Sequence, residues 1–161
     1  MIVAIISDIH DNLIYLEKCI SYCLKKNVRI VLCCGDITNN ETIKKLSDFK
    51  TDVYLIAGNA DNFTEDVFYL LPTIHYLGRT GKVIIEDKKI GLCHEPLYIE
   101  KMLKNNFDFI FYGHTHKPWV ETKGSTQVIN PGTLGGGSNP STFALWDTDK
   151  PMPVLIRTEM M

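Results

Sequence analysis

The chain opens with the stretch MIVAIISDIHDN, residues 1–12, in which an apolar run is followed by Asp8 and His10. A short run of this kind, rich in Ile and Val, predicts a strand that is buried on both faces. The polar residues begin where that strand ends, and Asn12 can cap a helix over residues 13–26. The opening therefore predicts a buried strand, a loop with functional side chains, and a helix that crosses over to the next strand.

The same pattern continues along the first half of the chain. Residues 29–34 (RIVLCC) and 53–57 (VYLIA) are predicted to be further buried strands, with a short helix over residues 40–48 between them. Strands that alternate with helices favour parallel pairing through crossover connections. The first half therefore predicts a βαβαβ unit.

The second half is predicted to contain more strands than helices. In chain order, its elements are strands over 82–87 and 89–94 joined by an Asp87-Lys88 turn, a helix over 97–106, a strand over 107–112, a hairpin over 119–130, and strands over 141–148 and 152–158. Two sheets packed on each other and flanked by helices would bury all of these apolar runs. The predicted fold class is α/β, in a single domain over residues 1–161.

Composition restricts the range of partners. The chain has 45% hydrophobic and 22% charged residues, and its formal net charge is −2. Because long nucleic acids are held by many basic residues, this balance disfavours them and leaves a small charged substrate open. No apolar run reaches the roughly 20 residues of a membrane span, and no signal peptide is recognisable. We therefore expect a cytoplasmic protein that does not use a membrane, while homo-oligomers stay open.

Several other residues are expected to be structural. No two cysteines form a C-x-x-C pair, so reduced thiols in the core are favoured over a zinc site. The cysteines are Cys19, Cys23, Cys33, Cys34 and Cys93. No other candidate ligand stands near His75 in the sequence, so this histidine is expected to be structural. Trp119 and Trp146 are expected in the core.

Polar side chains follow five of the predicted buried strands. In chain order they are Asp8, His10, Asp36, Asn59, His94, His114 and His116. The carboxyl ends of strands in an α/β sheet form its ligand-binding edge, so these side chains are expected to meet there. Divalent transition metals accept imidazole nitrogen and carboxylate oxygen. Gly35, Gly58 and Gly113 each directly precede a candidate and permit tight local turns.

Each candidate alone also has an ordinary interpretation. Asp36 and Asn59 are common turn residues, and a lone His94 is more often a partly buried structural histidine. Asp11 is expected to be a carboxylate at the N-terminus of the first helix rather than a ligand. The convergence of candidates at five strand ends favours a metal centre over these separate interpretations.

The ordered motifs resemble those of a known superfamily. They are D-x-H at 8–10, G-D at 35–36, G-N-x-D at 58–61, a strand-end His94, and G-H-x-H at 113–116. Together they resemble the calcineurin-like metallophosphoesterase superfamily, and most closely its small bacterial and archaeal phosphodiesterases, which share their fold with a retromer scaffold subunit. The resemblance covers residues 7–133. It implies the metallo-dependent phosphatase fold, a four-layer αββα sandwich of two mixed sheets.

The resemblance also implies a function and a distribution of ligands. The chain would be a metal-dependent phosphodiesterase with a dinuclear centre and a metal-bridging hydroxide as the nucleophile. One ion would be bound by Asp8, His10, Asp36 and His116, and the other by Asp36, Asn59, His94 and His114. Asp61 would orient a ligand or a backbone amide, so the residues expected to act in catalysis are Asp36, Asn59, Asp61 and His94. Manganese is favoured, with nickel, iron, cobalt or zinc as alternatives, and the substrate would be a small phosphodiester.

Departures from the family pattern modify these expectations. Many relatives carry a histidine where this chain has Ala60, and a missing general acid typically lowers rates about 10²–10⁴-fold. Diesters with acidic leaving groups are therefore expected to be the better substrates. Glu95 stands where relatives usually have glycine; it could tune metal affinity, bond to His94, or face away. The segment 130–133 (NPGT) resembles a loop that lines the site in the family.

Two other functions are compatible with the resemblance. A non-catalytic protein-binding scaffold of the same fold would tolerate the loss of ligands, yet all seven positions are filled in this chain. A nuclease of the superfamily is disfavoured by the nearly neutral net charge. Metal-dependent turnover would separate the enzyme from the scaffold.

Overall fold

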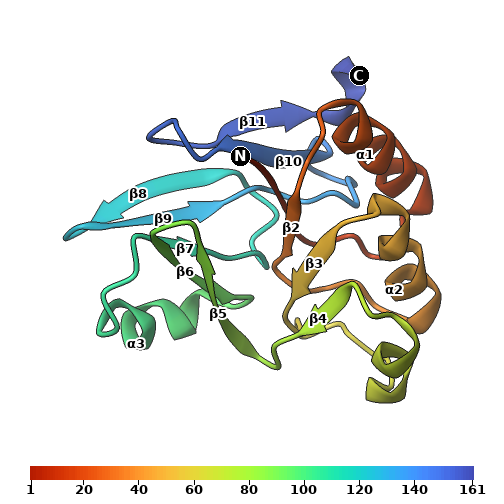
Figure 1. Ribbon diagram of the computed structural model, residues 1–161, viewed down its shortest axis with the longest axis horizontal. Coiled ribbons are helices and arrows are strands. Elements are labelled where there is room, and N and C mark those ends of the chain that lie inside the picture. Colours follow the sequence, from red (N-terminus) through yellow and green to blue (C-terminus); the bar gives the residue numbers. More distant parts are fainter.

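The computed structural model describes residues 1–161 and contains two mixed β-sheets packed face to face (Figure 1). The first sheet has the strand order β11-β10-β1-β2-β3-β4, and the second has the order β5-β6-β7-β9-β8. Helices α1 and α2 lie beside the first sheet, and α3 lies on the other side of the molecule (Figure 1). The predicted αββα arrangement is confirmed.

The first sheet contains the βαβαβ unit. Its parallel strands are β1 (Ile2–Ile6), β2 (Ile30–Cys33), β3 (Asp52–Leu55) and β4 (Ile74–Tyr76). The C-terminal hairpin of β10 (Thr142–Asp147) and β11 (Val154–Arg157) extends the sheet on the other side of β1, antiparallel to it. Both the unit and the closing hairpin were predicted, whereas β4 was missed because it is only three residues long and contains the polar His75.

Asparagine side chains cap the two helices of this unit. The Asn12 side chain accepts a hydrogen bond from the Tyr15 amide at the start of α1 (Leu13–Lys25). The Asn39 side chain does the same for the Thr42 amide at the start of α2 (Asn40–Leu46). Each bond satisfies an amide that the helix leaves free. α2 ends before the predicted residue 48 and passes into a 3₁₀ turn, Ser47–Phe49.

The second sheet is built largely as predicted, with small differences in the bounds. Its strands are β5 (Thr80–Ile85), β6 (Lys88–Cys93), β7 (Phe109–Phe111), β8 (Trp119–Lys123) and β9 (Thr126–Asn130). The β5–β6 turn lies at residues 86–87, one position earlier than expected, and Glu86 has a φ of 52°. α3 (Ile99–Leu103) is shorter than the predicted helix, because a 3₁₀ turn over Pro96–Tyr98 precedes it.

Three apolar layers hold the fold together. One joins α1 and α2 to the first sheet, one fills the space between the sheets, and one lies between α3 and the second sheet. All five cysteines are buried, and Trp146 is fully buried between the sheets. The prediction for Trp119 was wrong: its side chain is 58% exposed, because β8 is the edge strand of its sheet. His75 is structural as expected, paired with Asp52 at 2.8 Å and stacked on Tyr54.

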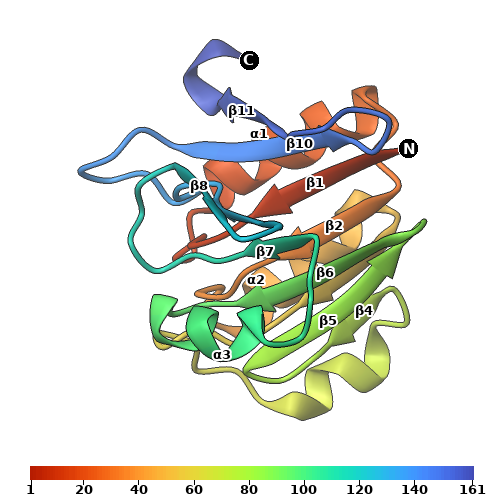
Figure 2. The ribbon, with the colours of Figure 1, turned by 90° about the vertical axis from the view of Figure 1, so that its left-hand side faces the viewer.

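The topology brings the strand-end loops together. Figure 2 shows the loops that follow β1, β6 and β7 on the same side of the molecule. The loops that follow β2 and β3 belong to the same parallel set as the loop after β1. No helix in the structure is both long and apolar enough to cross a membrane.

Candidate metal centre

The structure brings all seven candidate ligands into one cluster at the strand ends. Asp8 and His10 follow β1, Asp36 follows β2, Asn59 follows β3, His94 follows β6, and His114 and His116 follow β7. The side chains form two neighbouring groups, and the carboxylates of Asp8 and Asp36 lie between them. Five loops that are far apart in the sequence therefore contribute to one site.

The first group contains Asp8, His10 and His116. The Nε2 atom of His116 lies 3.2 Å from Asp8 Oδ1 and 3.0 Å from His10 Nε2. The Nε2 atom of His10 lies 3.8 Å from Asp8 Oδ1. One atom from each of these residues falls within a region 4.8 Å across, the size expected of ligands that share one ion.

The second group contains Asn59, His94 and His114. The Oδ1 atom of Asn59 lies 3.0 Å from His94 Nε2 and 2.8 Å from His114 Nδ1. The Oδ2 atom of Asp36 lies 3.3 Å from His94 Nε2 and 3.7 Å from His10 Nε2. A single carboxylate oxygen therefore faces both groups, as a bridging ligand would.

The hydrogen bonding of His94 indicates that this group of atoms fits a cation. Its Nδ1 donates to the backbone oxygen of Cys34, 2.7 Å away, because a carbonyl oxygen can only accept. In the neutral ring, Nε2 then carries a lone pair, and this lone pair faces the Asp36 and Asn59 oxygens. Three electron-rich atoms turned toward one another suit a divalent metal ion, and a backbone carbonyl is a usual partner for the far nitrogen of a ligating histidine.

The centre has a buried floor and an open rim. The floor consists of Asp8, Asp36 and His94, which are at most 2% exposed. The rim consists of His10, Asn59, His114 and His116, whose side chains reach solvent.

Burial alone would lower the pKa of His94, but the hydrogen bond to Asp36 and the nearby carboxylates outweigh it and raise that pKa. Burial would raise the pKa of Asp36, but bonds from His94 and from the Ala60 amide lower it overall.

The backbone at the ligand positions is unusual. Five of the seven candidates have left-handed conformations, with φ of 53° at Asp8, 47° at His10, 53° at Asp36, 68° at His114 and 58° at His116. Such conformations are unfavourable for residues with a Cβ and gather at functional sites. Glycine is required beside them: a Cβ at Gly58 would collide with the Asp36 carboxylate, and one at Gly113 with the Ser7 hydroxyl.

A further set of side chains holds the loops in place. Asp61 accepts hydrogen bonds from the amides of Thr38 and Gly58, both at 2.7 Å, so it ties the β2 and β3 loops together. Asn130 donates to the Gly113 carbonyl at 2.7 Å and accepts from the Gly132 amide. These contacts orient backbone segments without reaching the cluster of ligand atoms.

Four residues near the cluster have contacts that the sequence alone did not establish. The methyl group of Ala60 is exposed, and only its amide contributes, by donating to Asp36 Oδ1 at 2.8 Å. Glu95 makes no hydrogen bond to His94; its Oε1 lies 3.9 Å from Arg79, and its buried Oε2 has no partner. Asp11 directly precedes the N-cap of α1 and belongs to neither ligand group; its carboxylate accepts a hydrogen bond from the Thr42 hydroxyl of α2. Arg79 was missed.

Arg79 is the residue that no motif indicated. It lies in the turn before β5, and its Nη1 donates to the backbone oxygen of Gly58 at 3.1 Å. Because Gly58 directly precedes Asn59 and Glu95 directly follows His94, the Arg79 side chain contacts two ligand-bearing loops. The preceding Gly78 has a φ of 79° in the structure, but a single glycine in the sequence does not single out the residue that follows it.

Comparison with known families gives a match over almost the whole chain. Residues 1–151 match the family model described as the calcineurin-like phosphoesterase superfamily domain. A phosphodiesterase of Methanocaldococcus jannaschii is 29% identical over 93% of this chain and 95% of its own length. The phosphodiesterase YfcE of Escherichia coli is 24% identical over 89% of this chain and 85% of its own.

Solved structures show the same likeness. An archaeal phosphodiesterase matches with a TM-score of 0.87 and 28% identity over 98% of this chain and 99% of that one. Vacuolar protein sorting 29 from Cryptosporidium parvum matches with a TM-score of 0.71 and 22% identity over 96% of this chain and 95% of its own. At that identity, the second match shows only that the fold is shared.

Proposed function

Because the chain belongs to the calcineurin-like phosphoesterase superfamily and is accordingly a metal-dependent phosphoester hydrolase, we propose that it is a phosphodiesterase with a dinuclear centre at the five strand ends. The observation that carries this proposal is the position of Asp36, whose Oδ2 faces His10 on one side and His94 on the other. One carboxylate oxygen between two groups of nitrogen and oxygen ligands suits a pair of ions, while the other oxygen of Asp36 is held by the Ala60 amide.

We assign the ligands according to these two groups. Asp8, His10 and His116 would bind one divalent ion, Asn59, His94 and His114 the other, and Asp36 both. When bound, divalent ions supply Lewis-acid stabilisation of phosphoryl oxygens and activation of water near neutral pH. Manganese is our first choice, because mixed oxygen and nitrogen ligation suits it, as it does nickel, iron, cobalt and zinc.

The protein's own residues define how a diester would bind. The floor residues are buried and fixed by backbone bonds, while the rim residues reach solvent, so a phosphoryl group approaches from the rim side. Asp61 and Asn130 act as positioning residues that keep the ligand-bearing loops in register. Since Ala60 cannot donate a proton from its side chain, the leaving group departs with little help. Diesters with acidic leaving groups are therefore the preferred substrates.

Metal reconstitution with matched variants tests the proposal. Mn²⁺ added to the chelator-treated protein should switch on hydrolysis of bis(4-nitrophenyl) phosphate, and two ions should bind per chain. Asp36→Asn and His114→Ala should reduce that hydrolysis to background. His75→Ala is the control, because this half-buried histidine lies on β4 with Asp52 as its partner. Full activity in both ligand variants, or no turnover with any of the five metals, would instead favour a non-catalytic scaffold.

A further inference from the structure

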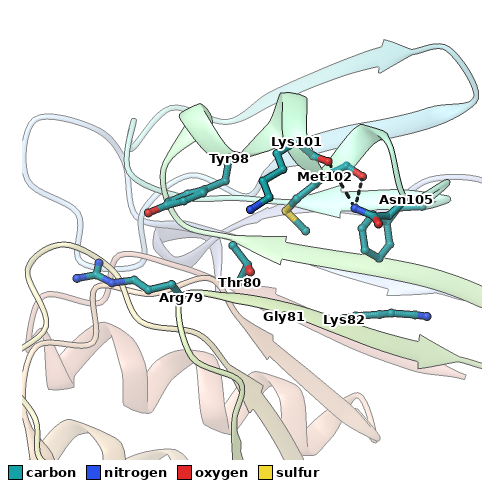
Figure 3. A pocket seen from close by; sticks show the side chains of 9 residues that line it. Arg79, Thr80, Gly81, Lys82, Tyr98, Lys101, Met102 and Asn105 are labelled. Carbon is teal, nitrogen blue, oxygen red and sulfur yellow. Dashed lines mark hydrogen bonds between the residues drawn. The ribbon is translucent and has the colours of Figure 1, made fainter.

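A second pocket opens beside the metal centre, between β5 and the segment that contains α3 (Figure 3). Its volume is about 450 Å³. The residues that matter for its chemistry are Arg79 from the turn before β5, Thr80 and Lys82 from β5, and Tyr98, Lys101 and Phe107 from the opposite side. No step of the proposed phosphodiesterase reaction uses this pocket.

The lining of this pocket is cationic. Three of its residues carry positive charge and none carries negative charge. Lys82 and Lys101 take part in no ion pair, and Arg79 has only a long contact of 3.9 Å with Glu95. Figure 3 shows the Lys101 ammonium turned toward Thr80, and the Arg79 guanidinium and Tyr98 hydroxyl turned to the same side. Unpaired cations beside hydroxyl groups form a site for an anion.

Two contacts connect one end of the pocket to the half of the centre that contains Asn59 and His94. Arg79 lines the pocket and also donates to the backbone oxygen of Gly58, the residue before Asn59. Thr80 pairs with Cys93, the residue before His94, across the β5–β6 ladder. The Arg79 and Thr80 end of the pocket therefore lies next to the loops that carry Asn59 and His94.

We propose that this pocket binds a second phosphate of the substrate, so that the enzyme prefers small phosphodiesters with a further phosphate group. The inference rests on the proposed phosphodiesterase function and adds the substrate class. Lys101 and Arg79 bind the second phosphate, and Tyr98 and Thr80 donate hydrogen bonds to it. Met102 and Phe107 form an apolar wall over Gly91, farther along β6 from His94 than Thr80 is.

Two substrates that differ by one phosphate test this assignment. Thymidine 5′-(4-nitrophenyl phosphate) and its 3′-phosphorylated counterpart release the same nitrophenolate and contain the same scissile diester. The wild-type Mn²⁺ enzyme should show a KM roughly three- to tenfold lower for the 3′-phosphorylated substrate, the range expected for one exposed, charge-assisted contact. Equal KM values would overturn the proposal while leaving the phosphodiesterase function in place.

Variants identify the residues responsible. Lys101→Met should remove most of the KM advantage of the 3′-phosphorylated substrate. Lys104→Met is the matched control, because it removes the same charge from the end of α3 outside the pocket, and it should preserve the advantage. Loss of the advantage in both variants, or in neither, would contradict the role assigned to Lys101.

Calorimetry on the Mn²⁺-loaded protein gives a readout that does not need turnover. Thymidine 3′,5′-bisphosphate should bind roughly three- to tenfold more tightly than thymidine 5′-phosphate, and Lys101→Met should abolish the difference. If nothing is hydrolysed but this difference is found, the phosphodiesterase proposal fails and the pocket stands. If inorganic phosphate alone binds with the same affinity and the same dependence on Lys101, the pocket is a site for free anions and the substrate assignment is wrong.

Discussion

The floor and the rim of the candidate metal centre contain similar chemical groups in very different settings. The floor residues Asp8, Asp36 and His94 are buried and make hydrogen bonds to backbone atoms of other loops. The rim residues are more exposed, and their side chains contact one another and the floor residues. This difference suggests that the floor determines whether metal binds, whereas the rim determines how the bound substrate reacts.

The largest effect is expected from replacing a floor residue. Asp36→Asn removes the carboxylate that faces both His10 and His94, so metal affinity and hydrolysis should both fall to background. His116→Ala on the rim should leave one tightly bound ion while still lowering the rate. Metal content measured on the purified, dialysed variants distinguishes the two outcomes. Equal loss of metal in both variants would remove the distinction between floor and rim.

Metal removal should reveal how much the floor contributes to stability. At a free metal concentration 100 times the dissociation constant, binding adds about 2.7 kcal/mol to the free energy of unfolding. For a chain of this length that is a rise in Tm of roughly 5–10 °C. Thermal unfolding with Mn²⁺ and with a chelator measures it. The rise should vanish in Asp36→Asn and persist in part in His116→Ala.

The support given to the rim can be tested at Asn130. This buried side chain donates to the Gly113 carbonyl and accepts from the Gly132 amide, so Asn130→Ala leaves these groups unsatisfied. The free energy of unfolding should fall by about 1–3 kcal/mol. Metal affinity should fall about 10–100-fold, as is usual when a residue that orients ligands is lost. Unchanged metal affinity would show that the loop after β7 needs no such support.

Metal affinity should also depend on pH. The hydrogen bond to Asp8 is the main cause that raises the pKa of His10 above its usual 6.5, and the pKa of His94 is raised as well. Because metal binds only the neutral ring, protonation competes with it, so affinity should fall as pH drops from 8 to 6. Each displaced proton contributes up to about tenfold per pH unit. Calorimetry in two buffers of different ionisation enthalpy counts the protons released, and a count of zero would contradict this.

The smallest effect is expected at Ala60, beside the rim. Ala60→His places an imidazole next to Asn59 on an exposed loop, where it can protonate a departing oxygen. Hydrolysis of an aryl diester should change less than about twofold, because nitrophenolate leaves without a proton. An alkyl leaving group should gain more, up to the roughly 10²-fold that a modestly placed acid provides. Equal gains on both substrates would point to an effect on binding instead.

The sequence predicted those parts of the molecule that depend on short-range patterns. Buried strands and asparagine caps leave local signals, and the ligand candidates stood out because each follows such a strand. Arg79 left no signal, because its importance comes from the β5–β6 pairing that brings it to Gly58. The exposure of Trp119 was missed for a related reason, because it depends on β8 lying at the edge of its sheet. The strand β4 was missed because it is only three residues long and contains the polar His75.

The left-handed backbone at five ligand positions has a consequence for how this protein can change. Each such residue stores about 1–3 kcal/mol of strain, less at the aspartates, which tolerate this conformation best. Glycine at any of these positions would relax the backbone and remove a ligand in one step. Selection for thermal stability in metal-poor conditions would therefore enrich inactive variants with an intact fold. Without selection for hydrolysis, substitutions at these positions would therefore remove catalysis while preserving or raising the stability of the fold.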